Sequence, residues 1–598
     1  MNISRIRIEN FRNFADFDVT LNGNIVVVGE NRVGKSNLLY ALRLLFDPSL
    51  PDSARQLTLS DFWDGLDGIS PEDRITIMVE ILNFERDLDL SAVLTDFRTD
   101  ADPHTVRLTY EFRPKPGLEK EPASEDDYEF ICYGGESETK RFGHDLRRRI
   151  RMDLLPALRD AEGELANWYR SPLRPLIERA FSHIDREDLN EIKEAIENAT
   201  EMLTEFDSVE ALENQLQELF TAMSGPKQDA KLSLGIATTS IPHIYRNIKL
   251  LIDEGRRTVS DASLGSANLI FLTLKSLELQ LQIDENKRDH TIFSIEEPEA
   301  HLHPHLQRSV YRHFFKNFVD IKDQSALSIV LTTHSPHVAS IAPLRSLLLM
   351  KDTKDGTVGC STANIPLTEA EVEDLERYLD VTRAEMLFSR GIILVEGDAE
   401  KFLLPVFAET LGYNLDHLGI TVCSVAGTNF VPYVKFLSWL EIPFAVITDW
   451  DPIEGKSPLG KNRAKKLVLL ADEIKNGMPP DDLDNELTQL IDDENKFCSR
   501  CESFGVFTNF HTLEVDLFEE GFAEKIIDRL SEHSWSRKRK AMIEEWSIDN
   551  NALNKDEYLS MIDEIGKGRF AQRLASLICG IEPPEYIRNA IEYVVSRV

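Results

Sequence analysis

Residues 29–36 have the sequence GENRVGKS, which matches the phosphate-binding pattern G-x-x-x-x-G-K-[ST]. The apolar run at 24–28 predicts a buried strand leading into this loop, and 36–46 (SNLLYALRLLF) predicts the helix that follows it. The N-terminus of a helix presents unpaired N–H groups and a positive dipole end, so it binds phosphate. Strand, loop and helix together predict an α/β nucleotide-binding domain of the P-loop class.

The side chains of this loop have expected roles in binding ATP. Lys35 is expected to reach the β- and γ-phosphates, and the Ser36 hydroxyl is expected to bind Mg²⁺. The predicted nucleotide-binding residues of this segment are Gly29, Asn31, Gly34, Lys35, Ser36 and Asn37.

A second predicted strand, 291–295 (TIFSI), ends in two carboxylates, Glu296 and Glu297. One carboxylate of such a pair can hold Mg²⁺, usually through water, and the next can polarise the water that attacks the phosphate. Glu296 stands where many such proteins have Asp, which lengthens its reach to the metal by one methylene group. We predict Glu296 as a nucleotide-site residue and Glu297 as the general base. A surface acidic pair at a strand end is the alternative interpretation.

Length and composition describe a folded protein of several domains. The chain has 598 residues, of which 42% are hydrophobic and 28% charged, and about two to four domains are expected. No apolar run approaches the length of a membrane span, and the start of the chain lacks the apolar segment of a signal peptide. Six scattered cysteines do not make a disulfide framework, so the expected location is cytoplasmic, with no membrane association.

The formal net charge of −36 argues against a surface that coats DNA non-specifically. Local basic patches and bound divalent metals can still reverse the field at a cleft. The candidate patches are 147–149 (RRR) with Arg151, 461–466 (KNRAKK) and 537–540 (RKRK). Each patch is either a solvated face or a contact with nucleic acid.

Hydrophobic periodicity divides the chain into segments of different character. Strands are predicted at 3–8 and 17–21, which can pair as a hairpin, and at 75–84, 105–112, 291–295 and 327–333. The stretch from about 145 to 255 looks helical, 351–366 resembles a turn or linker, 367–388 looks helical again, and 471–496 resembles an acidic loop. Strands at 391–395, 419–425 and 443–448 alternate with helices and predict a small α/β domain with a parallel sheet.

Carboxylates follow two strands of this small α/β domain. Glu396 comes directly after the first strand, and Glu400 lies one helical turn further on the same face. Asp449 and Asp451 end the strand 443–448 at alternate positions, so they are expected to face the same way.

A third pair, Glu514 and Asp516, follows another apolar stretch with the same spacing. Ligands of open α/β sheets bind at the carboxyl ends of parallel strands, so the three groups are expected to form one cluster. Like charges this close need cations between them, and hard oxygen ligands favour Mg²⁺ or Mn²⁺. Two such ions could activate a water molecule and stabilise the leaving oxygen of a phosphodiester.

Further stretches resemble motifs of ABC-type ATPases, in the branch that contains the RecF and SMC proteins. Residues 297–304 (EPEAHLHP) and 332–336 (TTHSP) resemble the extended Walker B, D-loop and switch histidine. Residues 263–266 (SLGS) resemble the signature loop, although they depart from L-S-G-G-Q. The resemblance implies that His334 senses the γ-phosphate and that Ser263 and Gly265 close on the ATP of a second protomer.

The pattern E-G-x-x-E followed by D-x-D resembles the Toprim domain, and a Toprim domain behind an ABC ATPase resembles the OLD (overcoming lysogenization defect) nuclease family. Three more stretches fit that family: 427–429 (GTN), 512–514 (TLE) and 566–571 (GKGRFA). By this resemblance the metal ligands are Glu396, Glu400, Asp449, Asp451, Glu514 and Asp516. Lys567 would stabilise charge on the phosphate in the transition state.

The resulting domain prediction is an ABC-type ATPase in two parts, 1–145 and 256–366, a helical insert at 146–255, and a Toprim domain with helical additions at 367–598. Within the insert, the acidic amphipathic segment 186–220 is either a packing layer or a dimerisation element. A homodimer or higher homo-oligomer is expected, because the resemblance implies an ATP site shared between protomers.

The leading functional hypothesis is an ATP-regulated, metal-dependent DNA endonuclease with ATP and Mg²⁺ or Mn²⁺ as cofactors. Two other enzymes use the same Toprim chemistry. A topoisomerase would need a separate domain with a nucleophilic Tyr, for which the sequence leaves no room. A primase would usually bring a zinc module, and the sequence shows no pattern for one. The hypothesis from another class is an ATP-gated DNA clamp or scaffold without nuclease activity. Family resemblance implies antiphage defence, with a helicase, a reverse transcriptase and its RNA, or no partner; the sequence does not choose among these.

Overall fold

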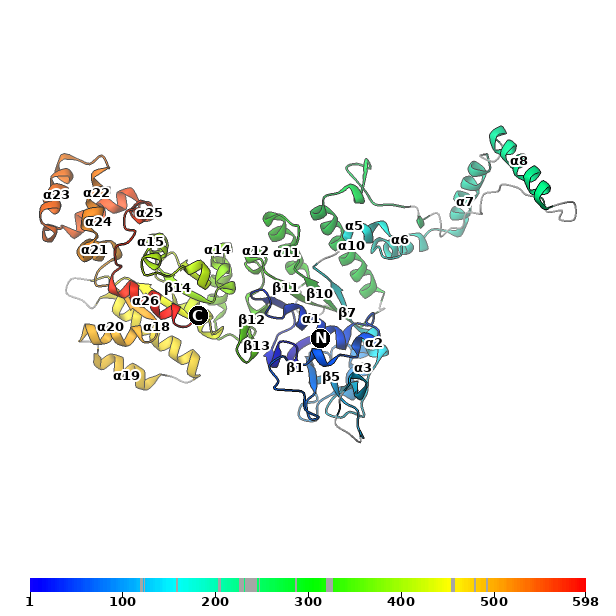
Figure 1. Ribbon diagram of the computed structural model, residues 1–598, viewed down its shortest axis with the longest axis horizontal. Helices are drawn as coiled ribbons and strands as arrows, with labels where there is room; N and C mark the ends of the chain where they lie inside the picture. The colour runs from blue at the N-terminus through cyan, green and yellow to red at the C-terminus, as the bar shows by residue number, and fades with distance from the viewer. Residues whose placement is uncertain are drawn as a thin grey trace. The chain divides into compact units, whose positions relative to one another are not determined.

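The computed structural model describes residues 1–118, 122, 124–157, 160–202, 206–224, 231, 245–246, 248–285, 288–318, 326–452, 458–477, 480–490 and 493–598. The chain forms two compact units (Figure 1). The first contains Met1–Pro156, His290–Glu299 and Pro304–Val598, and the second contains Ala157–Asp289 and Ala300–His303. Among the described residues, no helix combines the length and the apolar character needed to cross a bilayer.

The P-loop lies at one end of a six-stranded sheet in the first unit. Its strand order is β13-β12-β3-β11-β10-β7. The bounds are β3 Ile25–Val28, β7 Ile150–Leu155, β10 His290–Glu296, β11 Leu327–Thr333, β12 Leu347–Thr353 and β13 Gly356–Ser361. All are parallel to their neighbours except β13, which forms a hairpin with β12. Because β3, β11 and β10 are adjacent, the segments that follow them meet at one sheet edge.

A five-stranded antiparallel sheet packs on the other side of the P-loop helix. Its order is β2-β1-β4-β5-β6. The bounds are β1 Asn2–Phe11, β2 Phe14–Thr20, β4 Ile75–Leu82, β5 Val106–Pro114 and β6 Tyr128–Gly134. Helix α1 (Lys35–Phe46) contacts β5 of this sheet and β7 of the other, and most of its residues are buried (Figure 1). A helix that is apolar nearly all round is expected between two layers.

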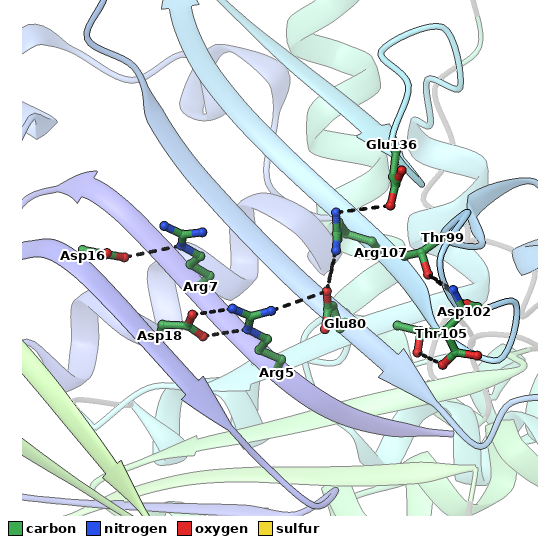
Figure 2. Close-up of polar contacts among 10 residues, drawn as sticks. All are labelled: Arg5, Arg7, Asp16, Asp18, Glu80, Thr99, Asp102, Thr105, Arg107 and Glu136. Atoms are coloured by element: carbon green, nitrogen blue, oxygen red, sulfur yellow. Dashed lines mark hydrogen bonds and ion pairs between the residues drawn. The ribbon is translucent and has the colours of Figure 1, made fainter.

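The antiparallel sheet alternates between an apolar face and a charged face. Ile6 and Ile8 of β1 are fully buried, whereas Arg5 and Arg7 lie on the opposite face. Arg5 donates a 2.7 Å hydrogen bond to Asp18 on β2, and the same face carries further cross-strand pairs (Figure 2). Such exposed pairs contribute about 0–1 kcal/mol each. The predicted hairpin of β1 and β2 is confirmed.

Two expectations about the ATPase region are wrong. Residues 150–155, expected to be helical, form β7, because pairing with β10 buries Ile150 and Met152. The sheet therefore extends past residue 145, where the helical insert was expected to begin. Residues 351–366, expected to be a turn or linker, include the end of β12, the hairpin turn and all of β13. In both places tertiary pairing outweighs local composition.

The second unit is mainly helical. Its helices include α5 Ala161–Ala166, α6 Leu173–Ser182, α7 Arg186–Glu201, α8 Asp207–Ser224 and α10 Leu264–Asp284. Helix α10 packs against α5 and α6. Helix α8 leaves four large apolar side chains exposed, at 39–80% of their full area: Leu212, Leu216, Leu219 and Met223.

The small α/β domain has a four-stranded parallel sheet of order β15-β14-β16-β17. The bounds are β14 Gly391–Val395, β15 Ile420–Ser424, β16 Phe444–Thr448 and β17 Val506–Thr508. The strands predicted at 391–395, 419–425 and 443–448 are confirmed. The expected acidic loop at 471–496 is wrong, since helices α18 (Leu459–Asn476), α19 (Asp481–Leu490) and α20 (Glu494–Glu502) cover it in part. Leu483, Leu487 and Phe497 are buried, so these helices have an apolar face.

Helices after β17 complete this domain. They are α21 Leu513–Leu517, α22 Ala523–Ser531, α23 Arg537–Ile548, α24 Lys555–Ile565, α25 Lys567–Ala575 and α26 Glu585–Val595. Helix α25 packs closely along α15 (Asp398–Thr410). Gly568 permits this approach, since a Cβ there would lie 3.2 Å from that of Asp398.

Candidate functional site

The P-loop is held by residues from the first β-hairpin. Gly34 has φ 86°, and a Cβ on it would lie 2.0 Å from Nδ2 of Asn13. Asn13 donates a 3.0 Å hydrogen bond to the Val33 carbonyl and accepts a 2.7 Å bond from Asn37. Asn37 also accepts a 2.8 Å bond from Arg12. Asn37 therefore braces the loop, and Arg12 and Asn13 are supporting residues that sequence reasoning missed.

Lys35 connects the loop to the histidine after β11. Its Nζ donates hydrogen bonds of 2.8 and 2.7 Å to the carbonyls of Gly29 and Glu30, and it lies 3.3 Å from Nδ1 of His334. Burial lowers the pKa of Lys35 to about 8, although nearby glutamates, Glu297 first among them, oppose the shift. Burial also lowers the pKa of His334, with Lys35 adding to the effect. Asn31 is exposed on the same loop.

The acidic pair after β10 reaches the same place. The Ser36 hydroxyl donates a hydrogen bond to Glu296. Oε1 of Glu297 lies 3.6 Å from Nε2 of His334. Glu297 has φ 44°, and its N–H donates a 3.0 Å bond to the Thr332 carbonyl. The structure therefore brings together the loop lysine and serine, both glutamates and the histidine.

Glu299 is a further residue of this site that sequence reasoning did not assign. Its carboxylate accepts hydrogen bonds of 2.9 Å from the Thr333 hydroxyl and 2.6 Å from the His334 N–H. Burial raises its pKa. Its place in 297–304, the stretch that resembles the extended Walker B and D-loop, was the signal in the sequence.

The predicted signature residues belong to the second unit. Ser263 is the exposed N-cap of α10, and its hydroxyl accepts a 3.3 Å hydrogen bond from the Ser266 N–H. Gly265 allows close packing, since a Cβ there would lie 2.6 Å from the His301 carbonyl oxygen.

The carboxylate cluster lies at the carboxyl ends of β14, β16 and β17. Oε1 of Glu396 accepts hydrogen bonds from the Thr448 hydroxyl at 2.6 Å, the Asp449 N–H at 3.0 Å and the Arg463 guanidinium at 2.6 Å. Arg463 also donates a 2.9 Å bond to Asp451. The Glu396 carbonyl accepts a 2.9 Å bond from Gly427, which links the Gly-Thr-Asn stretch to this edge.

The carboxyl groups of Asp449 and Glu400 both have raised pKa values. Burial and the neighbouring carboxylates of Glu400, Glu396 and Glu514 raise the pKa of Asp449 well above its usual range. Burial raises the pKa of Glu400 to about 7, with Glu514 and Glu396 adding to the effect. Asp449 also accepts a 2.5 Å hydrogen bond from Asn509, a buried residue that sequence reasoning missed.

Glu514 and Lys567 form the other end of the cluster. Nζ of Lys567, in the first turn of α25, lies 3.4 Å from Oε1 of Glu514. Burial opposes the charged form of Lys567, but Glu514 and Asp449 outweigh it and raise its pKa. Oε2 of Glu514 is buried without a hydrogen-bond partner.

The two-residue spacing of Glu514 and Asp516 does not place them on one face, as it would in a strand. Residues 513–517 form helix α21 rather than a strand, so side chains two apart point to different sides. Asp516 accepts hydrogen bonds from the N–H groups of Phe510 at 2.8 Å and His511 at 3.3 Å. Asp516 thus holds the loop between β17 and α21.

The donor set fits a divalent metal ion, because it consists of hard carboxylate oxygens, one of them buried and unpartnered. As the side chains stand, no three His, Cys, Asp or Glu residues of the described chain converge closely enough to hold an ion. Two of the predicted ligands, Glu396 and Asp451, are bound instead to Arg463.

Comparison with known proteins finds matches to both the ATPase region and the small α/β domain. Residues 387–451 match the family profile "Overcoming lysogenization defect protein-like, TOPRIM domain", and residues 25–340, more than half of the chain, match "AAA domain, putative AbiEii toxin, Type IV TA system". The chain is 25% identical to the Bacillus cereus endonuclease GajA over 516 residues, covering 80% of this chain and 82% of that protein.

A further full-length relative and a solved C-terminal region are also similar to this chain. The Thermus scotoductus OLD nuclease is 25% identical over 499 residues, covering 79% of this chain and 87% of the relative. The solved C-terminal region of the Burkholderia pseudomallei OLD protein is 43% identical and covers 35% of this chain and 98% of that structure, with a TM-score of 0.30. The chain belongs to the OLD (overcoming lysogenization defect) family of nucleases, with an N-terminal ATPase domain of the AAA/ABC type and a C-terminal OLD-like Toprim domain.

Proposed function

We propose that this protein is an ATP-regulated, divalent-metal-dependent DNA endonuclease. The observation that supports this most is the set of carboxylates at three neighbouring strand ends with Lys567 beside them. Relatives named as nucleases share most of the chain's length.

The residues that would hold Mg²⁺ or Mn²⁺ are Glu396, Glu400, Asp449, Asp451 and Glu514. When bound, such ions supply an activated water and stabilise the leaving oxygen of a phosphodiester. Lys567 is about half exposed, so its ammonium can donate a hydrogen bond to a phosphate oxygen of DNA while its other side faces Glu514. Asn509 and the Leu513 N–H orient Asp449 through its Oδ1.

The ATPase residues have separate roles in this proposal. Lys35 and Ser36 would bind the triphosphate and its Mg²⁺, with Glu296 beside the serine. Glu297 would accept the proton of the attacking water, and His334, 3.6 Å away, would sense the γ-phosphate. The bonds from Lys35 to the loop carbonyls hold its ammonium close to the position where it would bind phosphate. On ATP binding, Lys35 would exchange these bonds for bonds to phosphate oxygens.

We also propose that the protein works as a homodimer or larger homo-oligomer. Ser263 is exposed at the start of a long helix, where a second protomer's nucleotide can be reached. The apolar side chains exposed on α8 would be covered by the same segment of another protomer. We also propose a role in antiphage defence, on the basis of the family relationship. The protein would act alone, with a helicase, or with a reverse transcriptase and its RNA.

The proposal is tested by nicking of supercoiled plasmid DNA in Mg²⁺ or Mn²⁺. Wild-type protein and the surface control Asp482→Ala should both nick the plasmid, whereas Asp449→Ala should not. Normal nicking by Asp449→Ala would contradict the catalytic assignment. No cleavage by any of the three, together with ATP-dependent DNA binding, would instead support the clamp or scaffold hypothesis.

A further inference from the structure

We propose that Arg463 is a built-in competitor for metal: its guanidinium holds Glu396 and Asp451, and a divalent ion must displace it. This inference rests on the proposed nuclease function, because it concerns the same carboxylates. Arg463 lies in the KNRAKK patch, which the sequence suggested to be a solvated face or a nucleic-acid contact. The structure places this residue of the patch against the carboxylate cluster instead.

The start of α18 is fixed close to the cluster. A Cβ on Gly460 would lie 2.2 Å from the Asp449 carbonyl oxygen, so only glycine permits this approach. Lys461 is buried over the Trp450 ring, 5.9 Å from its centroid. These contacts fix the first turn of α18, so that Arg463 in the next turn points toward the carboxyl ends of β14 and β16.

The guanidinium bridges two carboxylates that come from different strands. Nη1 donates a 2.6 Å bond to Glu396, after β14, and Nη2 donates a 2.9 Å bond to Asp451, after β16. Nη1 also contacts the Thr448 hydroxyl at 2.5 Å and the Asp449 carbonyl at 3.4 Å. The side chain is only 15% exposed, so these charge-assisted bonds are poorly screened by solvent.

The bonds to Arg463 prevent the two carboxylates from turning toward a shared ion. Oε1 of Glu396 already accepts three hydrogen bonds, although an oxygen of this kind has only two lone pairs. This oxygen therefore has no free lone pair for a metal ion. Of these three donors, the Thr448 hydroxyl and the Asp449 N–H are attached to the strand end, whereas Arg463 has a long side chain that can withdraw. Departure of Arg463 therefore frees Glu396 and Asp451 together.

Lys567 provides a contrast at the opposite end of the cluster. Within the described part of the chain, its one ion pair is with Glu514, at 3.4 Å, and its side chain is about half exposed. It therefore competes less strongly and can turn toward a phosphate. This difference in burial and in the number of bonds assigns the role of competitor for metal to Arg463 rather than to Lys567.

The test is Mn²⁺ binding to the full-length protein, measured by calorimetry. Arg463→Gln, which keeps an amide donor but loses the charge, should bind Mn²⁺ about tenfold more tightly or better, since a charge-assisted contact no longer competes. Arg463→Lys keeps the charge without the two-pronged geometry and should fall between. The exposed Lys466→Gln on the same helix should match wild type.

If Arg463 only stabilised the structure of the site, its replacement would weaken Mn²⁺ binding instead of strengthening it. Unchanged or weaker Mn²⁺ binding by Arg463→Gln, with a wild-type melting temperature, would overturn the proposal. If Arg463→Gln melts early, Arg463→Lys decides: Mn²⁺ binding no tighter than wild type overturns the proposal. A wild-type protein that binds Mn²⁺ but does not nick plasmid would instead contradict the proposed function, so the two failures are distinguishable.

Discussion

Nζ of Lys35 lies 3.3 Å from Nδ1 of His334, although 299 residues separate them in the chain. The contact exists because β3, which leads into the P-loop, and β11, which ends directly before His334, are adjacent parallel strands. Glu297 follows β10, the next strand of the sheet, and lies 3.6 Å from the same histidine. One sheet edge therefore joins phosphate binding, water activation and γ-phosphate sensing in the proposed mechanism.

Lys35→Ala should abolish ATP binding or turnover, because the ammonium contacts the β- and γ-phosphates in this mechanism. Glu297→Gln should still bind ATP but hydrolyse it at least about a hundredfold more slowly, since the proton acceptor is gone. Equilibrium binding of a fluorescent ATP analogue and phosphate release separate the two effects. Wild-type turnover by Glu297→Gln would show that another group is the base.

Lys567→Ala should lose DNA nicking by about a hundredfold or more and still bind Mn²⁺, because the lysine faces phosphate rather than metal. Glu400→Ala should lose both nicking and Mn²⁺ binding. ATP hydrolysis should remain nearly intact in both variants, since neither touches the P-loop. Loss of Mn²⁺ binding in Lys567→Ala would refute the role given to this lysine.

Metal-free protein should become less stable as the pH rises from about 6 to 8. The folded-state pKa of Glu400 is raised to about 7, above its unfolded value, and that of Asp449 is also raised. A raised carboxyl pKa favours folding at low pH, and this contribution is lost as the pH passes through the folded value. Melting temperatures in EDTA should therefore fall across this range.

Added Mn²⁺ should reverse that fall at pH 8, because it neutralises the ionised carboxylates and binds only the folded site. Glu400→Gln is the matched variant, and its melting temperature in EDTA should depend less on pH. An equal pH dependence in Glu400→Gln and wild type would contradict the assignment to this residue.

Light scattering should show at least a dimer at micromolar concentration. Leu216→Glu combined with Leu219→Glu places charge on the apolar face of α8 and should reduce the assembled mass. Glu213→Gln with Glu218→Gln changes polar positions of the same helix and serves as control. A wild-type monomer, with and without ATP, would contradict the oligomer proposal.

Arg390 donates bonds of 2.8 and 2.9 Å to Glu30, and its side chain is 61% exposed. Arg390→Ala should lower the melting temperature by about 2 °C or less, because exposed ion pairs contribute little. Arg55→Ala should lower it much more, since buried Arg55 donates to the carbonyls of Leu44, Leu50 and Asp47. Differential scanning calorimetry compares the two, and equal shifts would contradict this ranking.

The sequence by itself determined the P-loop, most of the strands and the residue types of both sites. The P-loop could be predicted because its pattern lies between an apolar strand and a helix, all within about 25 consecutive residues. The strands at 391–395 and 443–448, and the carboxylates that follow them, were predictable for the same reason. Apolar runs bounded by polar turns are a local signal.

Only the tertiary structure decided which segments pair or pack and which distant residues meet, because a local sequence pattern does not contain this information. Residues 150–155 became β7 because β10 offered a pairing edge, and 513–517 became a helix, which turned Asp516 away from Glu514. Asn509 belongs to no motif, and the basic patch that contains Arg463 does not reveal its partner. Only the pairing of β17 with β16 and the close approach of Gly460 to Asp449 bring them to Asp449 and Glu396. Contacts between residues far apart in the chain depend on long-range packing, which hydrophobic periodicity does not encode.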